Sequence, residues 1–316
     1  MRIVFFGTPS FAKTILKYLL EQGVEVVAVV TRPDKPRGRS NKPVPSPVKE
    51  FALSQGIPLF QPPKASDPGF SAFLKTLQAD FFIVAAYAEI LKEAILEIPR
   101  LGCINVHGSL LPKYRGAAPV QRSIMAGDVE TGVTIMKMAV KMDAGDILAI
   151  SKTSIPFDMN AGELMEVLAN SGKVVLWEVM QGIEKGKVHP IQQDPTLATQ
   201  AKKITSEDAE VNWTLSQEEV HNQIRGVNPN PGAWCWVEIK NEKKRLQIKK
   251  TLPHGSIEGR PGEILSKNPS ELIVGCGKGS LQLLVVQLEG KKALTAKEFL
   301  RGISLDKIKF LPNSTI

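Results

Sequence analysis

The chain has 316 residues, of which 43% are hydrophobic and 23% are charged, and its formal net charge is +8. These values are ordinary for a soluble globular protein and exclude a disordered chain or a fibre. At roughly 150 residues per domain, the length predicts two domains.

The first half of the chain alternates strand-like and helix-like segments. Ser46 and Pro47 are a favourable helix start, as N-cap and first helical residue. Continuous apolar strands that alternate with amphipathic helices predict an α/β fold with a Rossmann-like, mostly parallel sheet. The expected strands are residues 3–6, 24–30, 81–87 and 103–107, and the expected helices are 11–23, 46–56 and 160–185.

The second half changes character after residue 189. Residues 190–206 lose periodicity and are predicted to form a linker. After a helix near residues 216–226, short strands separated by turns predict a small, OB-like β-barrel. We therefore expect a catalytic domain over residues 1–189 and a β-barrel domain over residues 207–316. The expected barrel strands are residues 233–239, 246–251, 262–265, 272–274 and 280–287.

The positive charge is concentrated in two segments. Residues 32–49 and residues 240–250 each hold six basic residues and one acidic residue, a net charge of +5 apiece. Residues 31–45 also form a proline-rich loop without apolar periodicity, and loops of this length are functional or disordered. Two local basic segments favour a polyanionic partner such as nucleic acid, although solvated surface loops have the same composition.

The cysteines and histidines exclude several kinds of site. Three widely separated cysteines predict buried thiols in a reducing cytoplasm, and the histidines lack metal-ligand spacing, so no metal is expected. The apolar runs are too short to span a membrane, and we expect a cytoplasmic monomer without membrane contact. Residues 275–280 resemble a phosphate loop, but Gly279 follows Lys278 where Ser or Thr is required, so a hairpin turn is expected.

Asn105 and His107 are the best candidates for chemistry. Because side chains alternate along a strand, both point to the same face at a strand's carboxyl end, where ligands of parallel sheets collect. A carboxamide beside an imidazole is a plausible oxyanion-binding pair. Asp143, in a tight turn, is a candidate to orient the imidazole and favour its protonated form. A structural histidine and a simple turn aspartate remain the alternatives.

Residues 105–119 (NVHGSLLPKYRGAAP), together with residues 142–146 (MDAGD), resemble the formyltransferases that use 10-formyltetrahydrofolate. The resemblance extends along nearly the whole chain, through Gly7-Thr8-Pro9, residues 37–39 and 45–49, residues 228–233 and residues 290–294. Residues 116–121 and the C-terminal segments resemble the tRNA-acting branch of that family. The family usually has Tyr-Gly where Tyr87-Ala88 stands in this chain.

The resemblance implies transfer of the formyl group from 10-formyltetrahydrofolate to the amino group of methionyl initiator tRNA, without a metal. It implies Asn105 and His107 as oxyanion donors and Asp143 as the group that orients His107. The residues expected to border the folate are Ser109, Leu110, Leu111 and Pro112, with Tyr87 and Ile90 at the pterin. The residues expected to contact tRNA are Arg37, Arg39 and Lys42 in the loop and Lys243, Lys244 and Arg245 on the barrel.

Two other functions fit parts of this pattern. A formyltransferase that acts on a small amine, such as an amino sugar nucleotide, would not need the basic segments. A non-catalytic RNA-binding protein on an inherited scaffold would not need His107. Replacing Arg39 or the basic residues 243–245 tests the first alternative, and replacing His107 tests the second.

Overall fold

The computed structural model describes residues 1–36, 43–255 and 257–312. Contacts between Cα atoms divide the chain into two compact units. The first unit consists of Met1–Pro119, Thr131–Thr153 and Met165–Ala201, and the second consists of Val120–Glu130, Ser154–Leu164 and Lys202–Ile316. The second unit thus includes two segments from the first half of the sequence. The domain boundaries expected at residues 189 and 206 stay a prediction.

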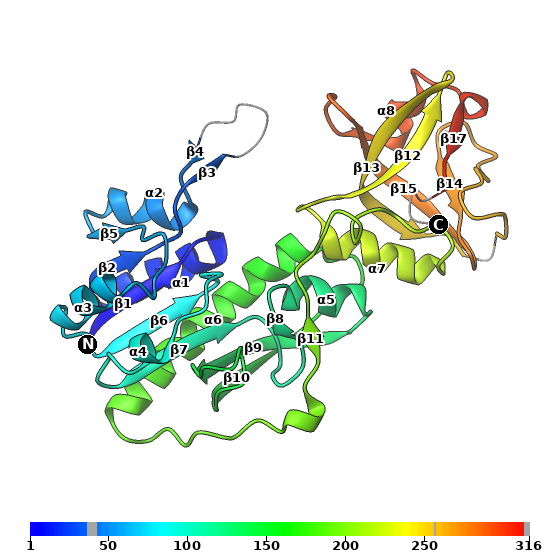
Figure 1. Cartoon of the computed structure of the whole chain (residues 1–316). Coiled ribbons are helices and arrows are strands. Elements are labelled where there is room, and N and C mark those ends of the chain that lie inside the picture. Colours follow the sequence, from blue (N-terminus) through cyan, green and yellow to red (C-terminus); the bar gives the residue numbers. More distant parts are fainter. Residues whose placement is uncertain (37–42, 256, 313–316) are drawn as a thin grey trace. The chain divides into compact units, whose positions relative to one another are not determined.

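A seven-stranded sheet is the centre of the first unit (Figure 1). Four pairings, among the strands that end at Gly7, Val30, Phe60, Ala85 and His107, are parallel. The strand ending at Lys137 runs antiparallel to the strand ending at His107. The predicted α/β, mostly parallel architecture is therefore confirmed. The strand order is β10 (Ile147–Ser154), β9 (Glu130–Lys137), β7 (Gly102–His107), β6 (Phe81–Ala85), β1 (Arg2–Gly7), β2 (Glu25–Val30) and β5 (Leu59–Phe60).

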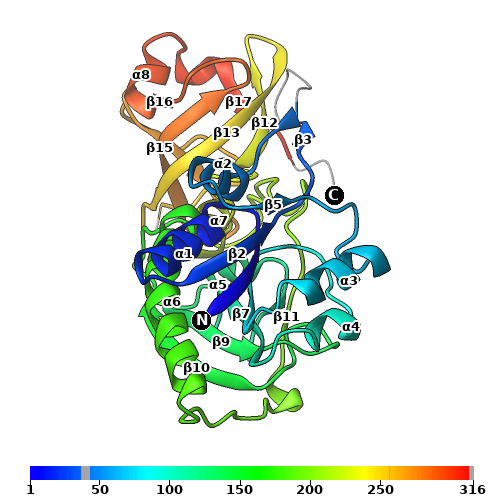
Figure 2. The ribbon, with the colours of Figure 1, turned by 90° about the vertical axis from the view of Figure 1, so that its left-hand side faces the viewer.

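Helices cover both faces of this sheet. Figure 2 shows α1 (Ser10–Glu21) and α6 (Ala161–Glu184) on one side and α3 (Pro68–Thr76) and α4 (Glu93–Leu96) on the other. Cys103 of β7 shares one core cluster with Leu74 of α3 and Ile95 of α4. Because side chains alternate, Asn105 and His107 face this same side, whereas Val106 lies against α6 at Gly172.

The start of the next helix agrees with its sequence signal. In α2 (Pro47–Ser54) the Ser46 hydroxyl accepts the Lys49 N–H at 3.1 Å, which confirms Ser46 as the N-cap. Lys49 also pairs with Asp34, with 2.6 Å between Nζ and Oδ2. Its ammonium lowers the pKa of the Asp34 carboxyl, to which Gln61 also donates a hydrogen bond. This network ties the chain after β2 to α2.

The segment expected to be a long loop begins and ends as a short ribbon. Within it, β3 (Lys35–Pro36) and β4 (Pro43–Val44) pair in antiparallel fashion. Neither strand has an alternating apolar pattern, so propensity did not reveal them. Residues 37–42, which include the candidate tRNA contacts Arg37, Arg39 and Lys42, lie outside the described residues.

The predicted linker contributes structure to the first unit. It contains a 3-10 turn, η1 (Pro195–Leu197), and β11 (Gln200–Ala201). β11 pairs in parallel with β8 (Arg115–Gly116), and the Arg115 N–H donates to the Thr199 carbonyl at 2.8 Å. The chain that leaves the first unit thus passes directly beside the segment 105–119, which carries the candidate residues Asn105 and His107. Among the described residues, no helix combines the length and apolar character needed to cross a bilayer.

The second unit is a curled antiparallel half-barrel. This confirms the prediction of a small, OB-like β-barrel domain as far as its curled antiparallel architecture is concerned. Its helices are α5 (Pro119–Met125), α7 (Gln217–Val227) and α8 (Ala296–Leu300), with a 3-10 turn η2 (Leu305–Lys307). Buried residues such as Trp213, Leu246 and Leu283 form its core. The strand order is β14 (Leu272–Gly275), β15 (Ser280–Leu288), β13 (Glu242–Pro253), β12 (Ala233–Ile239) and β17 (Ile308–Phe310), with β16 (Leu294–Thr295) paired to β15.

One expected barrel strand is wrong. Residues 262–265 are not a regular strand, and their β-bridge between Ile264 and Val274 is isolated. Backbone hydrogen bonds nevertheless join Gly262 and Glu263 to Gly275, and Leu265 to Ile273, so the segment lies along β14. The hairpin turn expected at residues 275–280 is confirmed: Gly275 pairs with Ser280, and the Cys276 N–H donates to the Gly279 carbonyl at 3.0 Å.

Candidate active site

Asn105 and His107 stand at the carboxyl end of β7 and are nearly enclosed, with exposed fractions of 8% and 5%. The antiparallel register with β9 sets Asn105 opposite Met136 and His107 opposite Thr134. Among the described residues, none makes a hydrogen bond to the Asn105 carboxamide. Its N–H group is therefore available to an oxygen atom of a substrate.

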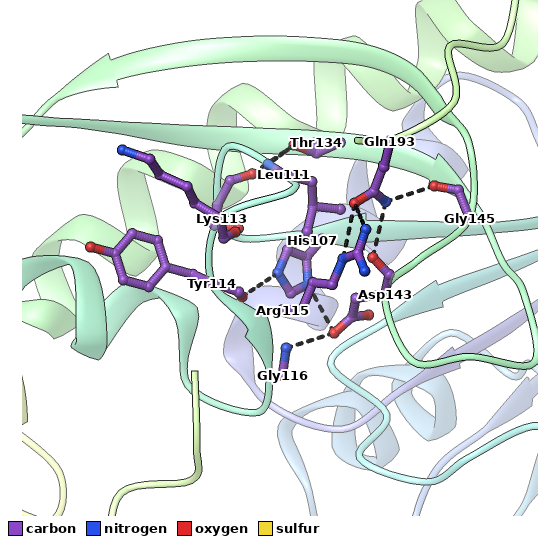
Figure 3. A network of polar contacts seen from close by, with 11 residues as sticks. His107, Leu111, Lys113, Tyr114, Arg115, Gly116, Thr134, Asp143, Gly145 and Gln193 are labelled. Atoms are coloured by element: carbon purple, nitrogen blue, oxygen red, sulfur yellow. Dashed lines mark hydrogen bonds and ion pairs between the residues drawn. The ribbon is translucent and has the colours of Figure 1, made fainter. Parts of the chain in front are cut away.

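The His107 imidazole lies between two oxygen atoms (Figure 3). Its Nε2 is 3.0 Å from the Tyr114 carbonyl oxygen, and its Nδ1 is 3.8 Å from Asp143 Oδ2. The first distance is a hydrogen bond, whereas the second is an ion-pair separation beyond hydrogen-bond range. Both ring nitrogens therefore face oxygen atoms, one at hydrogen-bond distance and one farther away.

Asp143 reaches the imidazole from the turn between β9 and β10. Its backbone adopts a left-handed φ of 49°, and its Oδ2 accepts the Gly116 N–H at 2.8 Å. At Gly145 a side chain would overlap the Lys137 carbonyl, so this close approach requires glycine. The structure thus brings together His107 and Asp143, which the sequence could only pair as a hypothesis.

The residues after β7 that were expected to border the folate mainly make contacts within their own loop and with β9. The buried Ser109 hydroxyl donates to the Lys113 carbonyl at 2.7 Å, and the Ser109 carbonyl accepts from the Thr134 hydroxyl at 2.7 Å. Leu111 is buried against Met136 and Ile147, while Leu110 and Pro112 are half-buried. These contacts hold the loop that presents the Tyr114 carbonyl to His107. Folate contacts from this segment stay a prediction.

The two expected pterin residues differ in exposure. Tyr87 is 2% exposed and its ring meets Phe6 edge-on, with 5.5 Å between ring centroids, inside the core. Burial, and then the charge of the neighbouring Glu89, raise the pKa of the Tyr87 hydroxyl. Ile90, in contrast, is 62% exposed. Of the two side chains, Ile90 is therefore the one accessible to a ligand.

The backbone is strained between Tyr87 and Ile90. Ala88 adopts a left-handed φ of 60°, where a Cβ is unfavourable. The Arg32 guanidinium donates to the Ala88 carbonyl at 3.2 Å, and the Ala65 N–H donates to Glu89 Oε1 at 2.7 Å. These two bonds hold the strained residue from both sides.

We expect Ala88→Gly to stabilise the protein by about 1 kcal/mol, because glycine adopts this conformation without steric cost. A thermal melt should show Tm higher by about 2–4 °C. Ala94→Gly, on an exposed turn of α4, is the matched control and should lower Tm, since glycine weakens a helix. An unchanged or lower Tm for Ala88→Gly would contradict the assigned strain.

Sequence reasoning missed Arg115 and Gln193. Arg115 is 5% exposed, and its Nε and Nη2 both donate to Gln193 Oε1, at 3.1 and 2.7 Å. Arg115 lies inside the segment that marks the site, so its position was a usable signal. Gln193 lies in the predicted linker, where no periodicity or motif distinguishes it.

The basic residues of the barrel are held against aromatic rings. The Lys243 ammonium lies 4.6 Å from the Trp236 ring centroid, and the Arg245 guanidinium lies 4.1 Å from that of Trp234. Lys244 instead pairs with Glu242 at 2.6 Å. Lys243 and Arg245 are therefore preoriented cations on one face of β12 and β13, whereas the charge of Lys244 is neutralised locally.

Among residues 1–36, 43–255 and 257–312, no group of three His, Cys, Asp or Glu side chains is arranged to hold a metal ion.

Two family models match this chain, one toward each end. The Formyl transferase model matches residues 1–180, and the Formyl transferase, C-terminal domain model matches residues 203–304. The chain belongs to the formyl transferase family.

Its relatives include methionyl-tRNA formyltransferases. The one from Protochlamydia amoebophila is 48% identical over 315 residues, which are 99% of this chain and 98% of the relative. The one from Chlamydia muridarum is 47% identical over 306 residues, which are 96% of this chain and 97% of the relative.

Two solved structures share the fold at low sequence identity. HypX from Aquifex aeolicus, in complex with tetrahydrofolic acid, has a TM-score of 0.65 and 17% identity, covering 95% of this chain and 47% of that one. WlaRD, a sugar 3N-formyl transferase, has a TM-score of 0.65 and 20% identity, covering 92% and 99%. At these identities the likeness establishes the fold alone.

Proposed function

We propose that this protein transfers the formyl group of 10-formyltetrahydrofolate to the free amino group of methionyl initiator tRNA, for the initiation of translation. The observation that carries the proposal is the placement of His107 beside Asp143 at the end of the strand that also bears Asn105. The full-length relatives at 47–48% identity support methionyl-tRNA as the acceptor.

The surroundings of the site fit a folate donor. Tyr87 and Leu91 belong to one core cluster, against which Met138 also packs. The segments around these residues expose large apolar side chains, with Ile90 62%, Val140 61% and Met142 54% exposed. Exposed apolar groups beside buried polar ones are what a planar, partly apolar ligand requires. When bound, the folate supplies an activated formyl group on N10.

The chain's own groups account for the charge that develops during transfer. The acceptor amine attacks the formyl carbon, and negative charge appears on the formyl oxygen. Asn105 donates a hydrogen bond to that oxygen, and His107 does so when its Nε2 exchanges the Tyr114 carbonyl for the formyl oxygen, a stabilisation of about 3–4 kcal/mol for a well-placed donor. Asp143 keeps the imidazole oriented. His107 also relays the proton that leaves the amine toward the departing N10.

The basic face of the barrel supports a tRNA acceptor over a small amine. We expect the double variant Lys243→Gln/Arg245→Gln to weaken tRNA binding and to reduce the slope of log K against log salt by about 2, one unit per lost phosphate contact. Titration of labelled tRNA at several salt concentrations measures both. Lys17→Gln, an exposed lysine of α1, is the control. An unchanged salt slope in the double variant would remove these residues from the tRNA interface.

The direct test supplies 10-formyltetrahydrofolate with methionyl initiator tRNA in one reaction and with amino sugar nucleotides in another. Formylmethionyl-tRNA is the expected product. Product only from the amino sugars would replace the proposed acceptor, and no product from either would overturn the activity. The proposal includes a cytoplasmic location, which the three free, buried cysteines favour. It also includes a monomeric state, which light scattering at assay concentrations tests.

A further inference from the structure

The side-chain amide of Gln193 is saturated with hydrogen bonds on both ends. Its exposed fraction is 6%, and its Oε1 accepts two N–H groups of the Arg115 guanidinium. Its Nε2 donates to the carbonyl oxygens of Asp143, at 2.9 Å, and Gly145, at 2.7 Å. Donors surround the oxygen and acceptors surround the nitrogen, so only one orientation of the amide satisfies this network.

The two carbonyls that Gln193 binds belong to the turn that carries Asp143. This turn has the left-handed backbone at Asp143 and the sterically closed position at Gly145. A left-handed non-glycine residue persists only where its surroundings hold it. Figure 3 shows Gln193 bonded to this turn on the side away from Gly116. The amide thus holds the backbone while Gly116 and His107 face the carboxylate.

Gln193 also binds a buried cation of the same network. Arg115 directly precedes Gly116, whose N–H binds Asp143 Oδ2. The Arg115 guanidinium directs its Nε and Nη2 to the neutral Gln193 oxygen. The amide therefore joins the segment that binds the Asp143 carboxylate to the turn that carries Asp143.

We propose that Gln193 is a positioning residue for formyl transfer, acting through Asp143 on His107. This inference rests on the proposed function, because it concerns the rate of that reaction. Gln193 does not touch the reacting atoms. It sets where the Asp143 carboxylate lies, through its hydrogen bonds to the carbonyls of Asp143 and Gly145.

Two substitutions separate positioning from stability. Gln193→Met removes all four hydrogen bonds. Gln193→Glu keeps an acceptor for Arg115 but turns a second oxygen toward the carbonyls of Asp143 and Gly145, which repels the turn. We expect both variants to lose about 10–100-fold in kcat, the size of effect that small misplacements of catalytic groups produce. KM for methionyl-tRNA and for the folate should stay within about threefold. A purely stabilising role predicts that folded Gln193→Glu retains full kcat.

A double-mutant cycle with Asp143→Asn gives the decisive readout. If Gln193 acts through Asp143, adding Gln193→Met to Asp143→Asn should lower kcat by less than about twofold further, because the interaction is already lost. Full additivity of the two losses would overturn the inference.

Gln223→Met is the matched control. Gln223 Nε2 also donates to two carbonyls, those of Asp208 and Glu210, and its Oε1 accepts the Asn212 N–H, in the second unit. Its replacement should lower Tm and leave kcat unchanged. If the unsubstituted protein formylates neither acceptor, the proposed function fails. If it is active and folded Gln193 variants keep kcat within about twofold, only this inference fails.

Discussion

Replacing His107 by alanine is expected to slow formyl transfer by about 10²–10⁴-fold in kcat, the range that a positioned acid–base group contributes. The imidazole is 5% exposed and lies between the Tyr114 carbonyl and the Asp143 carboxylate, so no water-borne buffer has ready access to its position. The loss should appear in kcat with KM nearly unchanged, because the interaction strengthens only as charge develops. Steady-state formylation of methionyl-tRNA measures both constants.

His221→Ala is the control for removing a buried histidine. Its Nδ1 lies 2.9 Å from the Thr251 hydroxyl and its Nε2 lies 3.1 Å from the Phe157 carbonyl, so it too bridges two oxygens. Burial lowers the pKa of His221, which favours a neutral structural role. Its loss should reduce Tm and spare kcat. Retention of more than a tenth of kcat by folded His107→Ala would assign the chemistry elsewhere.

The second large effect is expected at Asn105. Asn105→Ala should lower kcat by about 10²–10³-fold, as removal of one oxyanion donor does in other acyl-transfer sites. The carboxamide is 8% exposed at the end of β7 and is not engaged by other described residues, so its N–H is reserved for the substrate oxygen. The measurement is again kcat for formyl transfer, with folate binding followed separately.

Asn105→Asp sharpens the interpretation because it preserves size and replaces the donor by a negative charge. It should be at least as impaired as Asn105→Ala, since a carboxylate repels the developing oxyanion. Recovery of activity in Asn105→Asp would show that shape rather than hydrogen-bond donation matters at this position. Unchanged folate affinity in both variants is expected.

Local sequence patterns were sufficient to predict most helices and strands of the first unit. The apolar run near residues 3–6 became β1, and the run near residues 81–87 became β6, though it ends earlier, at Ala85. The Ser46 cap was correct because capping depends on neighbouring residues only. Short elements were not predicted. One example is β17, which has three residues and is stabilised by its pairing with β12. The expected strand at residues 262–265 hydrogen-bonds to β14 but forms a single isolated bridge, and such a difference in regularity is not visible in its sequence.

Some features of the candidate site could be predicted from the sequence, and others could not. Strand alternation predicted that Asn105 and His107 share a face, and the register confirms it. For Tyr87 the sequence left two interpretations open, a wall of the pterin site or a strand end in the core, and the structure places its ring in the core against Phe6. The sequence did not show that Lys243 and Arg245 lie over tryptophan rings, since cross-strand neighbours depend on the register of β12 and β13.

The sequence by itself determined the α/β and barrel architectures, the two basic segments and the residues at the end of β7, because each follows from composition or short-range periodicity. Only the tertiary structure decided that Asp143 meets His107 and that Gln193 joins Arg115 to the Asp143 turn. These contacts join segments far apart in the chain. They depend on how β7, β8, β9 and β11 pair. Irregular turns have no hydrophobic periodicity, so contacts between their residues cannot be predicted from the sequence pattern.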